Sequence, residues 1–283
     1  MKSMIASLVV CAVWCLAIAA EAAEKVEITA DVAYGHKDGL AMTFDVLRPT
    51  EHANGAGILV IQSGAWYSGS PPPEQSVVHN RMVLDKGFTV FIVRHGSGSK
   101  YLVPEIVDDL HRCVRFIRAN AARFGVDPRR LGAYGSSSGG HLALMLATTA
   151  DDGDPKAKDE LLRTSDRLAA VVAYCPPTDI RPWFKTNRWK EYQAFRFDPA
   201  IAGAYSPLLL VSAATAPTLL VHGDKDPVVP IEHSQKILAE MQKNHVACEL
   251  MVIKGADHGI GGDGNAAVAR AAWFEKHLLP ATR

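Results

Sequence analysis

The chain has 283 residues, enough for one large α/β domain or at most two small ones. Hydrophobic residues make up 48% and charged residues 21%, and 30 Lys and Arg residues balance 30 Asp and Glu residues, so the formal net charge is zero. This composition, which lacks long runs of like charge, argues against a nucleic-acid partner and an anionic membrane surface, and favours a small or neutral substrate.

The N-terminus has the pattern of a signal peptide. Lys2 gives a short positive region, residues 4–20 are almost entirely apolar, and Ala22 completes an Ala-x-Ala cleavage site. An uncleaved membrane anchor is the alternative, although the apolar run is short for a spanning helix. We predict a signal peptide over 1–22, no stable membrane insertion after its cleavage, and a secreted or periplasmic mature domain over 23–283.

Strand-like and helix-like segments alternate along the mature chain. The expected strands are 25–32, 41–47, 57–62, 88–93, 130–134, 168–174, 217–221 and 248–253, and the expected helices are 104–124, 141–149, 232–244 and 265–277. Several of these strands are apolar throughout, which is typical of strands buried on both faces of a sheet. The alternation predicts a mostly parallel sheet flanked by helices, with functional residues at the carboxyl ends of the strands.

Residues 151–206 interrupt this alternation. The segment begins with polar residues over 151–166 and then becomes rich in aromatic residues, namely Trp183, Phe184, Trp189, Tyr192, Phe195 and Phe197. One interpretation is a surface excursion with its own small core. The other, which we prefer, is a partial cap insertion over a substrate.

Three serines lie between the expected strand 130–134 and the helix that follows it. Only Ser137 has glycine two positions away on each side, at Gly135 and Gly139, whereas Ser136 and Ser138 do not. A G-x-S-x-G sequence between a strand and a helix is typical of a nucleophilic serine on a sharp turn. The alternative is a turn of small residues that only packs the helix on the strand.

A serine hydroxyl needs a base to become a nucleophile. His258 suits this role because it lies on a glycine-rich loop after the last expected strand. His222 and His95 also follow strands and remain alternatives. The base in turn needs an acidic partner that fixes its tautomer.

Two aspartates follow the strand 217–221. Asp226 precedes Pro227, which stiffens the loop, and we prefer it as the partner of the base. Asp224 is suited instead to hydrogen-bonding the backbone of the turn. The expected order along the chain is therefore serine, aspartate, histidine.

The loop after strand 57–62 is suited to stabilise an oxyanion. Gly64 and Ala65 are small enough for their backbone N–H groups to approach a substrate oxygen, and the N–H group of Ser138 would supply a further donor. An ordinary tight turn is the alternative. Trp66, which ends the Gln62–Trp66 sequence, is predicted to contact the substrate.

These segments resemble the α/β-hydrolase superfamily, and more narrowly its branch of acetyl esterases, lipase-like enzymes and bacterial feruloyl-esterase-like proteins. The resemblance covers roughly Ala41 to His277 and rests on GILVIQSGAWYSG, PEIVDDLHRCVRFIRANAARFGVDPRRLGAYGSSSGGHLA, VHGDKDPVVP and GADHG. It implies an α/β-hydrolase fold and ester hydrolysis through an acyl-enzyme without a metal or organic cofactor. The positions that match the catalytic triad are Ser137, Asp226 and His258, and those that match the oxyanion hole are Gly64, Ala65 and Ser138.

The chain departs from the pattern of this branch at two places. Relatives often have His-Gly-Gly-Gly or His-Gly-Gly-Ala where this chain has Gln62-Ser63-Gly64-Ala65, and residues 94–98 differ from the usual Tyr-Arg-Leu sequence. The first change bears on the substrate class more than on the chemistry, and the second indicates a flexible glycine loop near the site.

Cys113, Cys175 and Cys248 remain after the predicted cleavage. Their odd number requires at least one free thiol, and their apolar neighbours favour buried thiols, with one disulfide as the alternative. No group of Cys and His residues has the spacing of a zinc site.

We therefore predict a secreted serine esterase that acts on a small-molecule or carbohydrate ester, with acetyl or feruloyl esters of polysaccharide fragments as suggested substrates. The alternatives are a serine peptidase of the prolyl-oligopeptidase type, for whose propeller domain this chain has no room, and a non-catalytic binding protein on the same fold.

Overall fold

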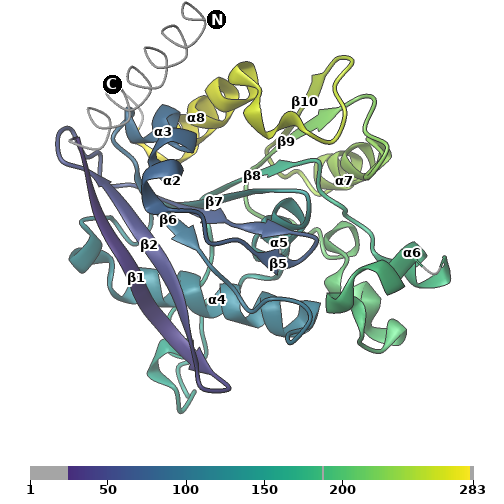
Figure 1. Ribbon diagram of the computed structural model, residues 1–283, viewed down its shortest axis with the longest axis horizontal. Helices are drawn as coiled ribbons and strands as arrows, with labels where there is room; N and C mark the ends of the chain where they lie inside the picture. The colour runs from purple at the N-terminus through teal and green to yellow at the C-terminus, as the bar shows by residue number, and fades with distance from the viewer. Residues whose placement is uncertain (1–24, 187, 281–283) are drawn as a thin grey trace, which may run out of the picture.

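The computed structural model describes residues 25–186 and 188–280 (Figure 1). The predicted signal peptide, residues 1–22, lies outside the described residues. Within the described part of the chain, no helix combines the length and the apolar character that a membrane-spanning segment requires.

A single eight-stranded sheet forms the centre of the molecule, in the order β1-β2-β6-β3-β7-β8-β9-β10. Its strands are β1 (Val26–Lys37), β2 (Leu40–Pro49), β3 (Gly57–Ile61), β6 (Thr89–Val93), β7 (Leu131–Ser136), β8 (Ala170–Tyr174), β9 (Thr218–Gly223) and β10 (Cys248–Ile253). β1 pairs with β2, and β2 with β6, in antiparallel fashion, and all other neighbours are parallel. The expected mostly parallel sheet is confirmed.

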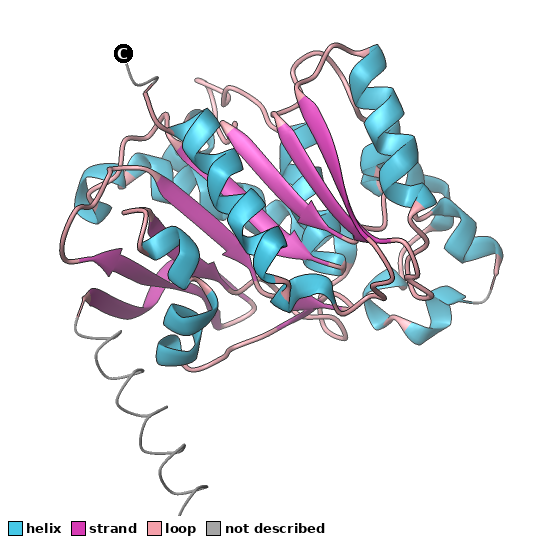
Figure 2. Ribbon diagram, turned by 90° about the horizontal axis from the view of Figure 1, so that it is seen from above, coloured by secondary structure: helices cyan, strands magenta, loops and turns pink. Residues whose placement is uncertain are grey.

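Helices cover both faces of this sheet (Figure 2). They are α2 (Pro73–His79), α3 (Arg81–Leu84), α4 (Val103–Ala119), α5 (Ser138–Thr149), α6 (Arg181–Lys185), α7 (Glu232–Lys243) and α8 (Gly264–Leu278). Side chains alternate between the faces along each strand, so Leu59 packs with residues of α4 and α5, and Ile58 packs with residues of α8. Every residue of β3 and β6 is buried, which explains their apolar sequences.

Short 3-10 helices occupy several connections. They are η1 (Ala121–Phe124), η2 (Glu160–Arg163), η3 (Arg188–Glu191), η4 (Gln193–Phe195), η5 (Pro199–Tyr205), η6 (Pro207–Leu209) and η7 (Ile260–Gly262). The single helix expected over 104–124 is thus divided into α4 and η1. The division falls at Asn120, and η1 ends at Gly125, whose φ of 67° is left-handed.

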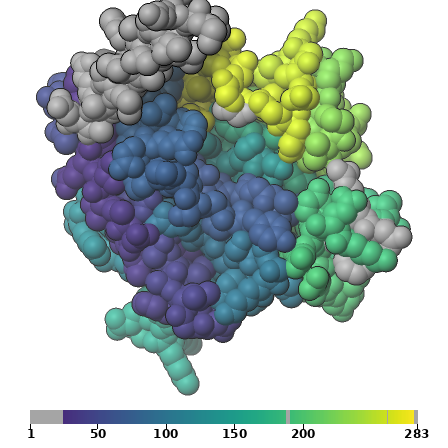
Figure 3. All heavy atoms as spheres, in the orientation of Figure 1, coloured from purple at the N-terminus to yellow at the C-terminus, as the bar shows by residue number. Residues whose placement is uncertain are grey.

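The segment 151–206 contains β8 of the central sheet, and its other regular elements are α6 and four of the 3-10 helices. Its green part forms a lobe on one side of the molecule (Figure 3). Trp183 and Phe195 of this segment belong to the same hydrophobic cluster as Leu59 and Phe91 of the central sheet. The aromatic part is therefore continuous with the main core, and the interpretation of a separate small core is wrong. We name residues 181–205 the aromatic insertion.

A tight turn joins β7 to α5 and places Ser137 between them. Ser137 has φ 54° and ψ −121°, a conformation that is costly for a residue with a side chain. A Cβ atom on Gly135 would lie 2.5 Å from the carbonyl carbon of Gly139, and one on Gly139 would lie 2.6 Å from the carbonyl oxygen of Ile61 in β3. The two glycines are therefore needed for the backbones to approach so closely.

We expect Gly139→Ala to lower the free energy of unfolding by about 1–3 kcal/mol, because the added methyl group must displace the backbone of β3 or of α5. Urea denaturation followed by circular dichroism measures the change. Gly264→Ala at the start of α8 is the matched control, since a Cβ atom there meets nothing within 4 Å. Equal stability of the Gly139→Ala protein and the wild type would contradict this account of the turn.

Candidate active site

Ser137, His258 and Asp226 form one continuous chain of hydrogen bonds at the carboxyl ends of β7, β9 and β10. The Oγ atom of Ser137 lies 2.9 Å from Nε2 of His258, and Nδ1 of His258 lies 2.6 Å from Oδ2 of Asp226. Because the carboxylate only accepts, Nδ1 carries a proton, and in the neutral ring Nε2 is free to accept the proton of the serine. The structure thus brings together the three residues that were predicted as a triad.

Asp226 is held by more than its contact with His258. Its side chain is fully buried, and Oδ1 accepts the backbone N–H groups of Val228 at 2.8 Å and Val229 at 2.9 Å. Burial by itself raises the pKa of Asp226, but the hydrogen bonds from His258 and from these N–H groups lower it below its ordinary value. Asp226 therefore remains a carboxylate at neutral pH.

His222, which was considered as the base, lies on the other side of Asp226. It is fully buried, its Nε2 lies 2.8 Å from the carbonyl oxygen of Val229 and 3.3 Å from Oδ2 of Asp226, and its Nδ1 lies 2.7 Å from Oγ of Ser234. Burial lowers the pKa of His222. It is therefore a neutral donor that helps to orient Asp226 rather than a partner of Ser137.

The remaining alternatives from the sequence lie elsewhere. His95 is buried and its Nδ1 contacts the carbonyl oxygen of Gly96, outside the hydrogen-bonded chain. Asp224 accepts the backbone N–H group of Gly255 at 2.6 Å, and so ties the loop after β9 to the loop that carries His258. Asp224 thus hydrogen-bonds the backbone of a different loop rather than that of its own turn, which was the expectation.

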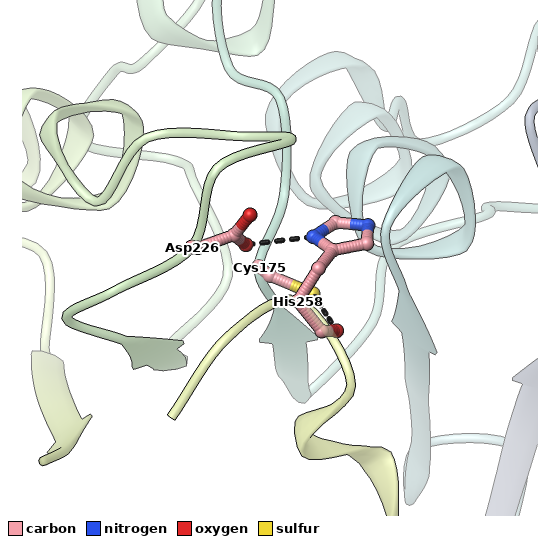
Figure 4. Close-up of side chains that lie close together, drawn as sticks. All are labelled: Cys175, Asp226 and His258. Carbon is pink, nitrogen blue, oxygen red and sulfur yellow. Dashed lines mark hydrogen bonds and ion pairs between the residues drawn. The ribbon is translucent and has the colours of Figure 1, made fainter. Parts of the chain in front are cut away.

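Cys175 lies directly beside Asp226 and His258 (Figure 4). Its sulfur lies 3.7 Å from the carbonyl oxygen of His258 and 3.6 Å from Oγ of Ser136, and its φ of 37° is unusual for a residue with a side chain. The ligand atoms of Cys175, Asp226 and His258 lie within 4.8 Å of one another, a donor set of the kind that Zn²⁺ prefers. In this structure Nδ1 of His258 and Oδ2 of Asp226 are hydrogen-bonded to each other. Cys113, Cys175 and Cys248 are all free thiols.

The surroundings of His258 raise its pKa to about 9. The Cys175 side chain makes the largest contribution, the Asp226 carboxylate adds to it, and burial opposes both. A thiol is only a weak hydrogen-bonding group, whereas Asp226 places a full charge 2.6 Å from Nδ1 of the ring. We therefore attribute most of the stabilisation of the imidazolium to Asp226.

The loop predicted to form the oxyanion hole folds back as a small hairpin, β4 (Ser63–Gly64) and β5 (Tyr67–Ser68). Ala65 at its tip has φ 51°. The Oγ atom of Ser63 lies 3.1 Å from Oγ of Ser138, the residue after the nucleophile, so a hydroxyl pair joins the two segments that would supply the donors. The oxyanion role of Gly64, Ala65 and Ser138 stays a prediction.

Trp66 does not lie where a substrate contact was expected. Its side chain is 1% exposed, and its indole Nε1 lies 3.2 Å from Nδ1 of His141 in α5. A buried ring offers no open face to a substrate, so the substrate-binding assignment of Trp66 does not fit the structure. The sequence Ser-Gly-Ala-Trp indicates that Trp66 belongs to the predicted oxyanion loop, residues 62–66, but not which way its side chain points.

Comparisons with known proteins agree with this geometry. A family model described as BD-FAE matches residues 44–241, and a model described as TAP-like protein matches residues 202–282. An ethyl acetate hydrolase of Pseudomonas putida is 26% identical over 259 residues, 86% of this chain and 78% of its own length. Esterase LipQ of Mycobacterium tuberculosis is 26% identical over 225 residues, 76% of this chain and 52% of its own length, so the chain spans about half of that relative.

Two solved structures are similar over most of their length. A thermophilic esterase of Thermogutta terrifontis, Est2 with propionate bound, has a TM-score of 0.73 and 25% identity, covering 91% of this chain and 97% of its own. An acetyl ester-xyloside bifunctional hydrolase of Caldicellulosiruptor lactoaceticus has a TM-score of 0.76 and 22% identity, covering 87% and 96%. The second likeness shows the α/β-hydrolase fold alone.

We expect the pKa of the His258 imidazole to lie above its ordinary value of about 6.5, and Asp226→Asn to lower it toward that value. The reason is that the negative carboxylate stabilises the protonated ring. Cys175→Ala should lower the pKa by less. NMR titration of the ring resonances measures each value.

Asp224→Asn is the matched control for this titration, because Asp224 lies on the same loop and binds the backbone of Gly255 rather than the ring. A His258 pKa that stays unchanged in Asp226→Asn would show that the carboxylate does not set the basicity of the ring. A larger decrease in Cys175→Ala than in Asp226→Asn would assign that role to the thiol instead.

Proposed function

This chain belongs to the BD-FAE family, and we propose that it is a secreted serine carboxylic-ester hydrolase that works through an acyl-enzyme. The observation that carries the proposal is the unbroken hydrogen-bonded chain Ser137–His258–Asp226. It is supported by the order of the three residues along the chain and by their position at the carboxyl ends of the strands.

The first half of the proposed reaction forms the acyl-enzyme. Oγ of Ser137 attacks the ester carbonyl carbon while Nε2 of His258 takes the hydroxyl proton. Asp226 stabilises the imidazolium that results, and the N–H groups of Ala65 and Ser138 stabilise the negative oxygen of the tetrahedral intermediate. The intermediate collapses with cleavage of the bond to the alcohol oxygen, which receives the proton from His258.

The second half releases the acid. Nε2 of His258 takes a proton from a water molecule, whose oxygen attacks the carbonyl carbon of the acyl-enzyme. The second tetrahedral intermediate is stabilised by the same N–H groups. Its collapse breaks the bond to Oγ of Ser137, to which His258 returns the proton, and the carboxylic acid leaves.

We propose acetyl or feruloyl esters of polysaccharide fragments as the substrates. The names of two relatives support the acetyl ester, since one is an ethyl acetate hydrolase and the other is an esterase with bound propionate, which is one carbon longer than acetate. The zero net charge and the predicted signal peptide over 1–22 support an exported enzyme acting on neutral material. We further propose that residues 151–206 form a partial cap over the substrate.

We expect Ser137→Ala to lower kcat for p-nitrophenyl acetate by about a thousandfold or more, because the nucleophile is removed. Initial rates of ester hydrolysis are measured with the predicted mature domain, residues 23–283, of each protein. Ser136→Ala is the matched control, since it removes the adjacent hydroxyl, which lies outside the hydrogen-bonded chain, and should keep most of the activity. Equal rates for Ser137→Ala and wild type would overturn the assignment of the nucleophile.

A substrate panel separates the proposed activity from the alternatives. The panel contains acetyl and butyryl esters, acetylated xylan, feruloyl esters and one peptidyl-arylamide. We expect the enzyme to hydrolyse esters and to leave the arylamide intact. Turnover of the arylamide alone would favour a peptidase. Failure of a fluorophosphonate probe to label Ser137 in the folded protein would favour a non-catalytic binding protein.

A further inference from the structure

The tip of the oxyanion loop has an unfavourable backbone conformation. Ala65 and Trp66 are consecutive residues with φ 51° and 61°, and neither is glycine. Left-handed residues with side chains persist only where their surroundings hold them in place. Trp66 therefore needs anchors that keep the Gly64–Ala65 backbone in the shape required to bind an oxyanion.

The first anchor is a hydrogen bond from the indole of Trp66 to His141. Nε1 of Trp66 donates to Nδ1 of His141 at 3.2 Å, and Nε2 of His141 donates to the carbonyl oxygen of Tyr205 at 2.9 Å. Because the carbonyl oxygen only accepts, Nε2 carries the proton and Nδ1 is a bare acceptor. His141 is fully buried and its pKa is lowered to about 4, so the ring is neutral and this tautomer can persist.

The second anchor is the aromatic insertion, residues 181–205. The ring of Trp66 makes edge contacts with Phe195 at a centroid distance of 4.6 Å, with Tyr192 at 5.6 Å and with Trp183 at 5.8 Å. These contacts fix the plane of the indole and exclude water from its bond to His141. The insertion thus surrounds the side chain of the residue that ends the oxyanion loop.

His141 also belongs to the helix that begins at the nucleophile. Its backbone N–H group donates to the carbonyl oxygen of Ser137 at 2.9 Å. His141 therefore contacts three parts of the site. Its backbone contacts the turn that carries Ser137, and its imidazole contacts the loop that carries Gly64 and Ala65 and, through Tyr205, the aromatic insertion.

From this geometry we propose that Trp66 and His141 are a positioning pair, which holds the oxyanion loop in its catalytic conformation and couples that loop to the aromatic insertion. The inference rests on the proposed esterase function. An oxyanion hole acts on the charge that develops in the transition state, so loss of the pair lowers kcat and leaves KM nearly unchanged. A contribution to ground-state binding alone would instead raise KM.

The test compares two buried tryptophans. Trp66→Phe removes the N–H donor to His141 and keeps an aromatic ring, and kcat for p-nitrophenyl acetate is expected to fall ten- to hundredfold, with KM within about threefold of wild type. Trp273→Phe is the matched control, because Trp273 in α8 is also buried and its indole nitrogen has no hydrogen-bond partner among the described residues. Its kcat is expected to equal that of wild type.

Variants of His141 supply a rescue experiment. His141→Leu leaves both the indole N–H group and the carbonyl oxygen of Tyr205 unpaired, and should lower kcat at least as much as Trp66→Phe. His141→Gln provides one acceptor and one donor in a side chain of similar reach, and should recover much of the lost kcat. A His141→Gln protein as impaired as His141→Leu, a wild-type kcat in Trp66→Phe, or a decrease expressed entirely in KM would overturn the proposal.

A second readout does not depend on activity. Hydrogen–deuterium exchange of residues 63–68 is expected to be faster in Trp66→Phe and His141→Leu than in wild type or Trp273→Phe. If the wild type hydrolyses no ester, the proposed function fails, and exchange then decides the positioning role separately. Unchanged exchange in both variants would show that the pair does not hold the loop.

Discussion

Helix α5 approaches the ends of β3 and β7 so closely that no side chain fits between their backbones. The Cβ positions of Gly135 and Gly139 both lie within 2.6 Å of backbone atoms, and this contact forces Ser137 into its positive-φ turn. The nucleophile is therefore presented by backbone packing, which is rigid, rather than by a mobile loop. Its N–H group donates to the carbonyl oxygen of Tyr174 at the end of β8, so three neighbouring strands define where Oγ lies.

The side chain of Asp226 stays ionised although it is buried. Burial opposes its ionisation, and three hydrogen-bonding groups around the carboxylate reverse that effect: two backbone N–H groups and His258. The resulting carboxylate fixes the tautomer of His258 and stabilises its protonated form. Because Asp224 ties its loop to that of His258, the distance between acid and base is set by the backbone as well as by their own contact.

The sheet and the triad residues could be predicted from the sequence because their signals are local. Strands buried on both faces are apolar throughout, and Ser137 is distinguished from its neighbours by the spacing of Gly135 and Gly139. The contacts of Trp66 and His141 could not be predicted, since they join residues 75 positions apart and depend on which way each side chain points. Cys175 carried no signal either: its apolar surroundings indicated a buried thiol, which is correct, but not its place beside His258.

Backbone strain at and beside the triad is held by side-chain contacts. Ala65, Trp66, Ser137 and Cys175 all have positive φ angles, come from three separate segments and belong to the triad or to its neighbouring loops. Such strain must be offset by surrounding contacts. Ser63 supplies one of these contacts through the hydrogen bond between its hydroxyl and that of Ser138, and Trp66 supplies another through His141. Side-chain contacts therefore hold the backbone of this loop in its left-handed conformation, so the shape of the loop depends on the residues around it, including the aromatic insertion.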